Sequence, residues 1–230
     1  MTREPNRKLR RQALRGMAQL TVVMGIAIFV SAGTWRYPEG WTFLLAFVGS
    51  SVFITRYLMK HDPKLLQRRV EAGPGAEKRN SQKVIQIFAS IAFLSVIIVP
   101  SLDHRFAWSR VPWWVVAAGD ALVLLGFWIV FLVFRENSFT SAVIEVDPEQ
   151  KVIDTGPYAH VRHPMYAGAL LLLAGIPLAL GSWWGLLTLV PFTGIIAVRL
   201  LDEERFLSKE LPGYTAYRVK IRYRLIPHVW

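Results

Sequence analysis

Six long apolar stretches, separated by short basic segments, constrain this chain more than any other feature. A helix that crosses the hydrocarbon core of a bilayer needs about 20 mostly apolar residues, with a range of about 17 to 25. The stretches are residues 17–35, 40–59, 84–102, 111–134, 165–180 and 183–201. Because only helices and closed barrels satisfy their backbone inside lipid, the pattern predicts an all-α polytopic membrane helix bundle of about six spans.

The last two stretches meet at Gly181-Ser182, which predicts that they form a tight helical hairpin. Residues 165–180 are slightly short for a span, but they start directly after Pro164, a residue suited to the first turn of a helix. The first stretch follows a cluster of basic residues and could be a signal peptide. Its apolar core is long for that role and more spans follow, so a retained first span is expected.

The charge distribution predicts an orientation. The net charge is +11, a value that can indicate nucleic-acid binding. Here the basic residues flank apolar spans, so no nucleic-acid partner is expected. With a cytoplasmic N-terminus and six crossings, only Arg36, Arg105 and Arg110 of the 27 Lys and Arg residues fall outside. The positive-inside rule therefore predicts cytoplasmic N- and C-termini.

Two further residue types narrow the possibilities. The chain has no cysteine, which excludes disulfides and thiol chemistry. Tryptophan rings prefer the membrane interface, and a set of them falls near the predicted outer ends of the spans. These are Trp35, Trp41, Trp108, Trp113, Trp114, Trp183 and Trp184.

Three predicted cytoplasmic segments are long enough to carry chemistry: residues 60–83, 135–164 and 202–230. The first is interpreted as a basic loop, broken by glycine and proline, that contacts anionic lipid headgroups and has no catalytic pattern. Within the second, residues 141–153 are expected to be extended and exposed.

The second segment ends in the motif GPYAHVRHPMY, residues 156–166. Gly156-Pro157 marks a turn, and a helix is expected to begin near His163-Pro164. The unpaired N–H groups and positive dipole end of that helix form a natural anion site. Tyr158 and Tyr166 add aromatic faces that can stack on a ring or a cation. His160-x-x-His163 has metal-like spacing, but Pro164 interrupts any helix that would hold both, so no metal is expected.

The third segment begins where the hairpin returns to the cytoplasmic side. Arg199 and Glu203 are four residues apart and share a helix face, and the adjacent Glu203 and Glu204 stand out in a basic surrounding. The hairpin is expected to gather one cluster of side chains. Its members are Arg162, His163, Tyr166, Arg199 and Glu203.

The combination of GPYAHVRHPMY, an apolar hairpin, R-x-x-x-E-E at 199–204 and GYTAYRVKIRYRLIP resembles a known family. It is similar to the integral-membrane isoprenylcysteine carboxyl methyltransferases and their bacterial and archaeal relatives, with the phospholipid methyltransferases as close kin. The resemblance covers roughly residues 120 to 227 and includes the RENSF stretch from Arg135 to Phe139.

The resemblance implies a pocket for S-adenosylmethionine that faces the cytoplasm of a bacterial or archaeal inner membrane. It also implies a lipophilic substrate that enters from the bilayer. Residues 1–134 would form a basic segment and four spans, and residues 135–230 a catalytic region with a cofactor loop, the hairpin and a C-terminal lid. The cofactor residues implied are Gln150, Lys151, Val152, Ile153, Tyr158, His163, Pro164, Met165, Tyr166 and Glu203 or Glu204. Arg199 would lie near the methyl acceptor, and His163 would be the base for an acceptor that must lose a proton.

The acceptor expected first is the carboxylate of an isoprenylcysteine-like molecule, which needs no base and which Arg199 could orient. A phospholipid amine and a small thiol remain as alternatives. A non-enzymatic transporter or assembly factor is the alternative from another class. A transporter would be expected to show an inverted repeat and several polar residues within its spans; the sequence shows only Asp120 there. The sequence does not decide the oligomeric state.

Overall fold

The computed structural model describes residues 3–70, 80–141 and 146–230. Parts of the basic segment 60–83 and of the segment 141–153 therefore lie outside the described residues. The side chains of residues 3–6, 80 and 81 lie outside them as well.

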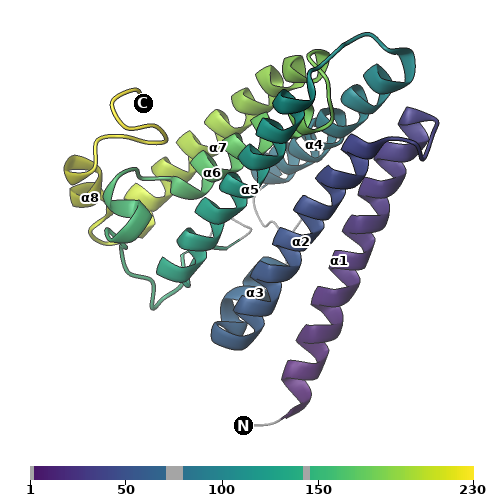
Figure 1. Ribbon diagram of the computed structural model, residues 1–230. Helices are drawn as coiled ribbons and strands as arrows, with labels where there is room; N and C mark the ends of the chain where they lie inside the picture. Colours follow the sequence, from purple (N-terminus) through teal and green to yellow (C-terminus); the bar gives the residue numbers. More distant parts are fainter. Residues whose placement is uncertain (1–2, 71–79, 142–145) are drawn as a thin grey trace.

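All six apolar stretches are helical (Figure 1). The helices are α1 (Arg3–Ala32), α2 (Pro38–His61), α3 (Pro63–Val70), α4 (Asn80–Phe106), α5 (Trp113–Glu136), α6 (Pro164–Ala179), α7 (Leu189–Glu210) and α8 (Tyr214–Lys220), with short 3-10 turns η1 (Gly156–Ala159) and η2 (Trp184–Thr188). Within these described ranges, five helical segments can cross a membrane by length and composition, and α6 is a shorter apolar helix. The predicted all-α membrane bundle is confirmed, and within the described ranges there is no strand.

The outer surface of the bundle is apolar along the spans. Val30, Leu45 and Val190 expose 66%, 76% and 73% of their surface. Water would disfavour such a surface, whereas lipid tails are as apolar as these side chains. The inner core is built from large buried residues such as Met24, Ile97 and Ile176. The spans are therefore apolar both toward the core of the bundle and on its outer surface, as the spans of an integral membrane protein have to be.

Glycines hold α5 and α6 together over their whole length. A Cβ atom at Gly119 would lie 2.2 Å from the backbone nitrogen of Ala179, and one at Gly126 would lie 2.7 Å from the carbonyl oxygen of Gly168. Small residues let membrane helices approach this closely. The contact between α5 and α6 is the most extensive between any two elements. It fixes the start of α6 relative to the end of α5.

The predicted hairpin turn lies at Gly181, whose φ is 68°, and Ser182. The Ser182 hydroxyl donates to the carboxylate of Asp103 and accepts from the backbone N–H of Gly185. Nearby, the Tyr37 hydroxyl donates to the carbonyl of Leu180. These bonds tie the hairpin turn to α4 and to the start of α2. All the tryptophans predicted as anchors lie at this end of the bundle, and each is at least 44% exposed.

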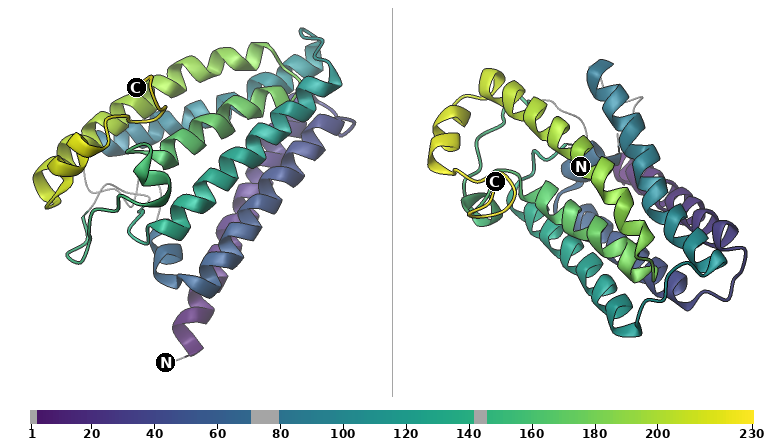
Figure 2. Two further views of the ribbon diagram at one scale, coloured as in Figure 1. Left: turned by 60° about the vertical axis from the view of Figure 1, so that its left-hand side comes forward. Right: turned by 90° about the horizontal axis from the view of Figure 1, so that it is seen from above.

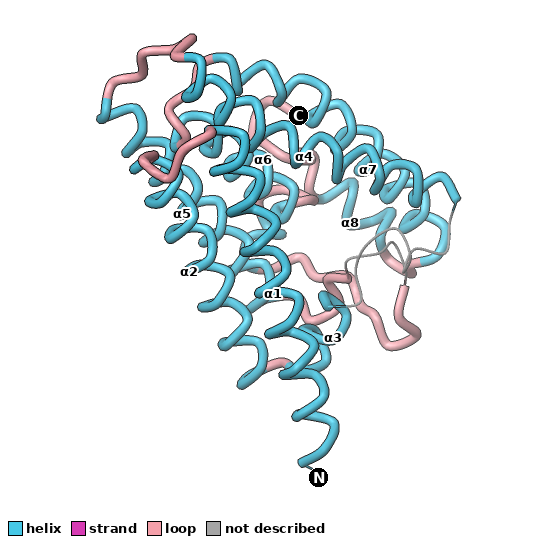
Figure 3. Tube along the Cα trace, turned by 90° about the vertical axis from the view of Figure 1, so that its right-hand side faces the viewer, coloured by secondary structure: helices cyan, strands magenta, loops and turns pink. Residues whose placement is uncertain are grey.

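The segment 60–83 is not a plain loop, which corrects the interpretation of this part of the sequence. Residues Pro63–Val70 form α3, which packs against α1 and α2 (Figure 3). Its Leu65 and Leu66 are buried in a cluster with Ala13 of α1 and Leu58 of α2. The Asp62 carboxylate accepts a hydrogen bond of 2.9 Å from the backbone N–H of Leu65 and so caps the first turn. The helix places its last arginine, Arg69, against the site described next.

Candidate active site

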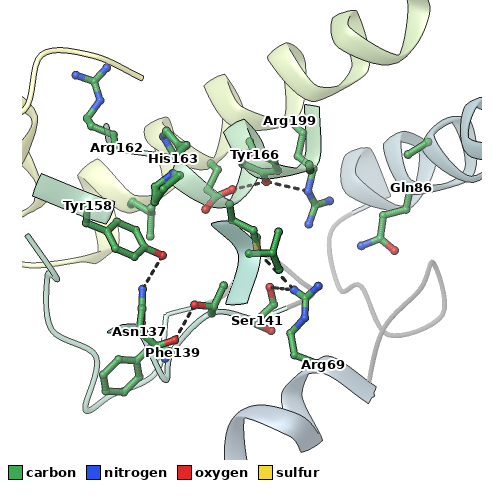
Figure 4. Close-up of a pocket in the computed structure, with 18 of the residues that line it drawn as sticks. Arg69, Gln86, Asn137, Phe139, Ser141, Tyr158, Arg162, His163, Tyr166 and Arg199 are labelled. Atoms are coloured by element: carbon green, nitrogen blue, oxygen red, sulfur yellow. Dashed lines mark hydrogen bonds between the residues drawn. The ribbon is translucent and has the colours of Figure 1, made fainter. Parts of the chain in front are cut away.

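A cavity of about 730 Å³ opens at the end of the bundle where α5 ends and α6 begins. Its lining comes from α1, α3, α4, α5, α6, α7 and α8 and from the connection between α5 and α6. Pockets for small ligands measure about 300 to 1,000 Å³, so the cavity has the size of a binding site. Figure 4 shows its polar side chains converging from several elements.

The motif at 156–166 forms the predicted turn and helix start. Gly156 has a φ of 55°, which glycine adopts without strain. The turn η1 follows and directs Tyr158 into the cavity, where the Asn137 amide donates a hydrogen bond of 3.0 Å to the Tyr158 hydroxyl (Figure 4). Asn137 caps the end of α5. This bond therefore joins the two ends of the α5–α6 connection, and α6 begins at Pro164 as predicted.

Glu204 of α7 is the centre of a buried charge cluster. Its Oε1 lies 2.6 Å from Nε of Arg162 and 3.3 Å from Nε2 of His163. Its Oε2 lies 3.1 Å from Nε of Arg224. Only 4% of the Glu204 side chain is exposed, and a buried carboxylate is tolerated when partners of this kind surround it. Glu204 does not line the cavity.

Arg162 also anchors the C-terminal segment. Its Nη1 donates to the carbonyls of Ile221 at 2.9 Å and Arg222 at 3.0 Å, and its backbone N–H donates to the carbonyl of Tyr223. The backbone N–H of His163 donates to the carbonyl of Arg224. The C-terminal segment consequently lies against the start of α6, and α8 lies beside it at the end of α7 (Figure 2).

A second polar cluster, formed by one residue of α6 and two of α7, faces the cavity. The Tyr166 hydroxyl donates to Oε2 of Glu203 at 2.6 Å and accepts from Nε of Arg199 at 3.2 Å (Figure 4). Arg199 also donates from Nη1 to Oε1 of Gln82 at 3.0 Å, and the Gln82 amide donates to Asp202. All three members of the cluster, Tyr166, Arg199 and Glu203, line the cavity. The chain thus presents a carboxylate, a phenol and a guanidinium side by side.

Aromatic rings cover this end of the cavity. Tyr214 and Tyr217 of α8 are buried and line it, and the Tyr217 hydroxyl donates to the carbonyl of Tyr158 at 2.9 Å. Burial raises the pKa of Tyr158, Tyr214 and Tyr217, so all three remain neutral phenols at physiological pH. Gln150 to Ile153 lie beside them in the lining.

The opposite end of the cavity is apolar. Met24 of α1, Ala89 and Phe93 of α4, and Phe192 of α7 line it. At its rim, Leu20 and Val23 expose 40% and 49% of their surface. The cavity therefore runs from a polar, aromatic end to an apolar end between α1 and α4.

The cavity brings together nearly all the residues expected from the sequence. Its lining includes Gln150, Lys151, Val152, Ile153, Tyr158, His163, Pro164, Met165, Tyr166, Arg199 and Glu203. The sequence left open whether Glu203 or Glu204 contacts the cofactor. In the structure, Glu203 faces the cavity and Glu204 lies in the buried cluster. His163 lines the cavity but its Nε2 faces Glu204. Asp120 lies about two turns into α5 and is not part of the lining.

Sequence reasoning missed two residues of the site. Asn137 lies in the RENSF stretch but received no role, although it holds Tyr158. Arg69 was assigned to a loop without chemistry. The signal for Arg69 was Pro63 followed by a leucine pair two residues later, which suits a short amphipathic helix beginning at a proline.

Residues 114–212 match the sequence profile of the phospholipid methyltransferase family. This segment, somewhat less than half of the chain, is therefore similar to that family. The match covers α5, α6, α7 and the connections between them. The predicted resemblance to integral-membrane methyltransferases is thereby confirmed, and the profile is that of the phospholipid branch. No curated protein matches the chain.

Phospholipid methyltransferases use S-adenosylmethionine, which confirms the predicted cofactor. The residues in the cavity fit this molecule. Tyrosine faces suit a sulfonium cation, Glu203 suits an ammonium or a pair of hydroxyls, and the first N–H groups of α6 suit a carboxylate. Arg162, His163, Tyr166, Arg199 and Glu203 lie within the family segment, whereas Arg69 and α8 lie outside it.

Proposed function

We propose that this phospholipid methyltransferase transfers the methyl group of S-adenosylmethionine to the polar head of a membrane lipid. One observation carries the proposal: a single cavity joins a polar end, walled by tyrosines and Glu203, to an apolar end between α1 and α4. A donor that is soluble in water and an acceptor that is soluble in lipid can each reach such a cavity from its own phase.

The polar end is the proposed cofactor site. The bound cofactor supplies a methyl group on a positively charged sulfur. The rings of Tyr158 and Tyr214 would face this cation and, as neutral phenols, exclude water from it. Glu203 would accept hydrogen bonds from the ammonium or the ribose hydroxyls.

The Glu203–Tyr166–Arg199 cluster would position the acceptor. The Tyr166 hydroxyl is held from both sides, by Glu203 at 2.6 Å and by Arg199 at 3.2 Å. Methyl transfer is an in-line displacement, so fixed groups that orient the acceptor supply much of the rate.

The name of the family favours the amine of a phospholipid as the acceptor. An ammonium must lose a proton before it can attack, and Glu203 is the carboxylate that lines the cavity beside Arg199. The carboxylate acceptor expected from the sequence is the second candidate. Arg199 favours it, because a guanidinium binds a carboxylate through paired hydrogen bonds. A cytoplasmic site on an inner membrane, as the charge pattern predicts, is part of the proposal.

The test uses the purified protein in nanodiscs with radiolabelled S-adenosylmethionine. One set of nanodiscs contains phosphatidylethanolamine, and a second set contains a prenylated cysteine analogue in a neutral lipid. Methyl esters release methanol in base, whereas methylated amines do not, so base treatment of the lipid extract separates the two candidates. Binding of S-adenosylhomocysteine without labelling of either lipid would reject both acceptors. A folded protein that binds neither cofactor form would reject the function.

A further inference from the structure

Arg69 reaches the cavity from α3, and its contacts with the described residues are to a backbone carbonyl, a sulfur and an aromatic ring. Its Nη1 donates to the carbonyl of Ser141 at 3.1 Å and contacts Sδ of Met165 at 4.0 Å, and its guanidinium lies 5.2 Å from the centre of the Phe134 ring. Among the described residues, no carboxylate forms an ion pair with Arg69. The adjacent Arg68 differs, because its Nη2 lies 2.6 Å from Oδ2 of Asp147.

A second cation faces Arg69 across the cavity. Figure 4 shows Arg69 from α3 and Arg199 from α7 extending toward the same space from opposite walls, with Gln86 of α4 beside them. Burial lowers the pKa of Arg69, and the positive charge of Arg199 lowers it further. Two cations that share a partly dehydrated space repel each other, and an anion placed between them removes that repulsion.

The two arginines lie where the polar and apolar ends of the cavity meet. Along α7, Glu203 lies about one turn to one side of Arg199, whereas the apolar Phe192 lies about two turns to the other side, and all three line the cavity. An amphiphile with its chain between α1 and α4 would place its head at this junction. A guanidinium is the cation best suited to anionic oxygens in such a setting, since it is weakly hydrated and offers several donors in one plane.

We infer that Arg69 and Arg199 together bind the anionic oxygen group, phosphodiester or carboxylate, of the lipid acceptor. This inference rests on the proposed lipid methyl transfer and adds a recognition residue to it. Arg69 lies outside the segment 114–212 that matches the family. The N-terminal half of the chain, which supplies α1, α3 and α4, thereby takes part in selecting the acceptor.

The experiment compares Arg69→Gln with Arg68→Gln in nanodiscs. The neighbouring Arg68 carries the same charge but does not line the cavity, so it controls for a general loss of positive charge. Arg69→Gln is expected to raise the KM for the lipid acceptor by about tenfold to a hundredfold, as expected for a lost hydrogen bond to a charged group. The affinity for S-adenosylhomocysteine should stay that of the wild type. Arg69→Lys should restore part of the loss, because it keeps the charge without the planar donor pair.

Two results would overturn the inference. One is an acceptor KM in Arg69→Gln equal to that in Arg68→Gln. The other is a parallel loss of S-adenosylhomocysteine affinity, which would assign Arg69 to the cofactor carboxylate or to the fold.

A binding measurement keeps the inference testable if the wild type methylates none of the lipids. Dodecyl phosphate, dodecanoate and dodecanol are titrated calorimetrically into the protein in nonionic detergent. The inference requires that the wild type bind an anionic probe more tightly than the alcohol and that Arg69→Gln remove this preference. Equal binding of all three probes would reject the arginine pair, whereas failed methylation alone would reject the two acceptors tested and would leave the arginine pair unaffected. The stronger of the two anionic probes identifies phosphate or carboxylate as the group bound.

Discussion

Two adjacent acids on α7 have opposite surroundings. Glu204 is surrounded by Arg162, His163 and Arg224 and is 4% exposed, so its charge is neutralised within the protein. Glu203 shares one hydrogen bond with Tyr166 and lines a cavity. Within one turn of the helix, one acid therefore holds the C-terminal segment in place, and the acid before it faces the cavity, where we propose that it binds a ligand.

The Glu204 cluster stabilises the structure around the site. Arg162 joins the start of α6 both to Glu204 and to the carbonyls of Ile221 and Arg222. The C-terminal segment that covers the cavity is thus fixed to the motif that forms the cavity's floor. The hydrogen bonds given above for the Glu203 cluster join α7 to α6 and α4 and not to the C-terminal segment. Replacements at the two positions should therefore separate stability from binding.

The largest effect is expected for Glu204→Ala. Removing one partner of a buried ion cluster leaves the other charges unpaired, which costs about 3 to 5 kcal/mol of folding free energy. The thermal unfolding midpoint in detergent should fall well below that of Glu203→Ala, the matched control on the next residue. Equal midpoints for the two variants would contradict the distinction between them.

A smaller effect, on binding rather than stability, is expected for Glu203→Gln. Loss of a charged hydrogen-bond acceptor should lower the affinity for S-adenosylhomocysteine by about tenfold to a hundredfold, which is equivalent to about 1.5 to 3 kcal/mol. Calorimetry measures this affinity, and the unfolding midpoint of the same sample checks that the fold is retained. An unchanged affinity would remove Glu203 from the proposed cofactor site.

Tyr166→Phe should have a weaker effect again. The substitution removes the hydroxyl that bridges Glu203 and Arg199 but keeps the ring and both charges. Because the two charged residues are four apart on α7 and can then pair directly, the loss should be below that of a hydrogen bond to a charged group, about 1 kcal/mol or about fivefold in turnover. Single-turnover rates at saturating cofactor measure it. A rate equal to that of the wild type would show that the cluster does not position the acceptor.

The sequence predicted the helices because each span has to be apolar around its whole circumference. Such an apolar stretch can be recognised without knowing which other helix it packs against. Gly181-Ser182 and Pro164 then marked the ends of the hairpin. The pairing of α5 with α6 could not be predicted in this way. The sequence shows that residues 126 and 168 are glycines, but it does not show that they face each other. The pairing of two helices depends on how their surfaces pack, and neither helix specifies this alone.

The same limit applies to the site. Successive residues on a helix point about 100° apart, so the sequence could place Glu203 and Glu204 near the motif without saying which faces the cavity. Arg69 was missed because α3 is short and its segment is strongly basic, which favours a loop interpretation. The packing of α3 is determined by Leu65 and Leu66 and not by its charged residues.

The smallest effect is expected at the exposed edge of the lid. Nζ of Lys220 on α8 lies 2.6 Å from Oδ2 of Asp154, with both side chains well exposed to solvent. The hydrogen bond from Lys220 lowers the pKa of Asp154 below its ordinary value of 3.8. A lowered pKa means that the pair stabilises the closed lid above that value and loses this contribution as the pH falls through the lowered pKa.

Lys220→Ala should therefore slightly increase hydrogen exchange in residues 214–224 at pH 7 and at pH 5. The difference from the wild type should shrink as the pH falls below about 4 and disappear only below the lowered pKa, where Asp154 is protonated in both proteins. Exposed pairs contribute little, so the increase should be far smaller than in Glu204→Ala. If Lys220→Ala released the segment as fully as Glu204→Ala does, the lid would be held at its edge. The buried cluster around Glu204 would then form only after the C-terminal segment has docked, and it would not be what holds the segment in place.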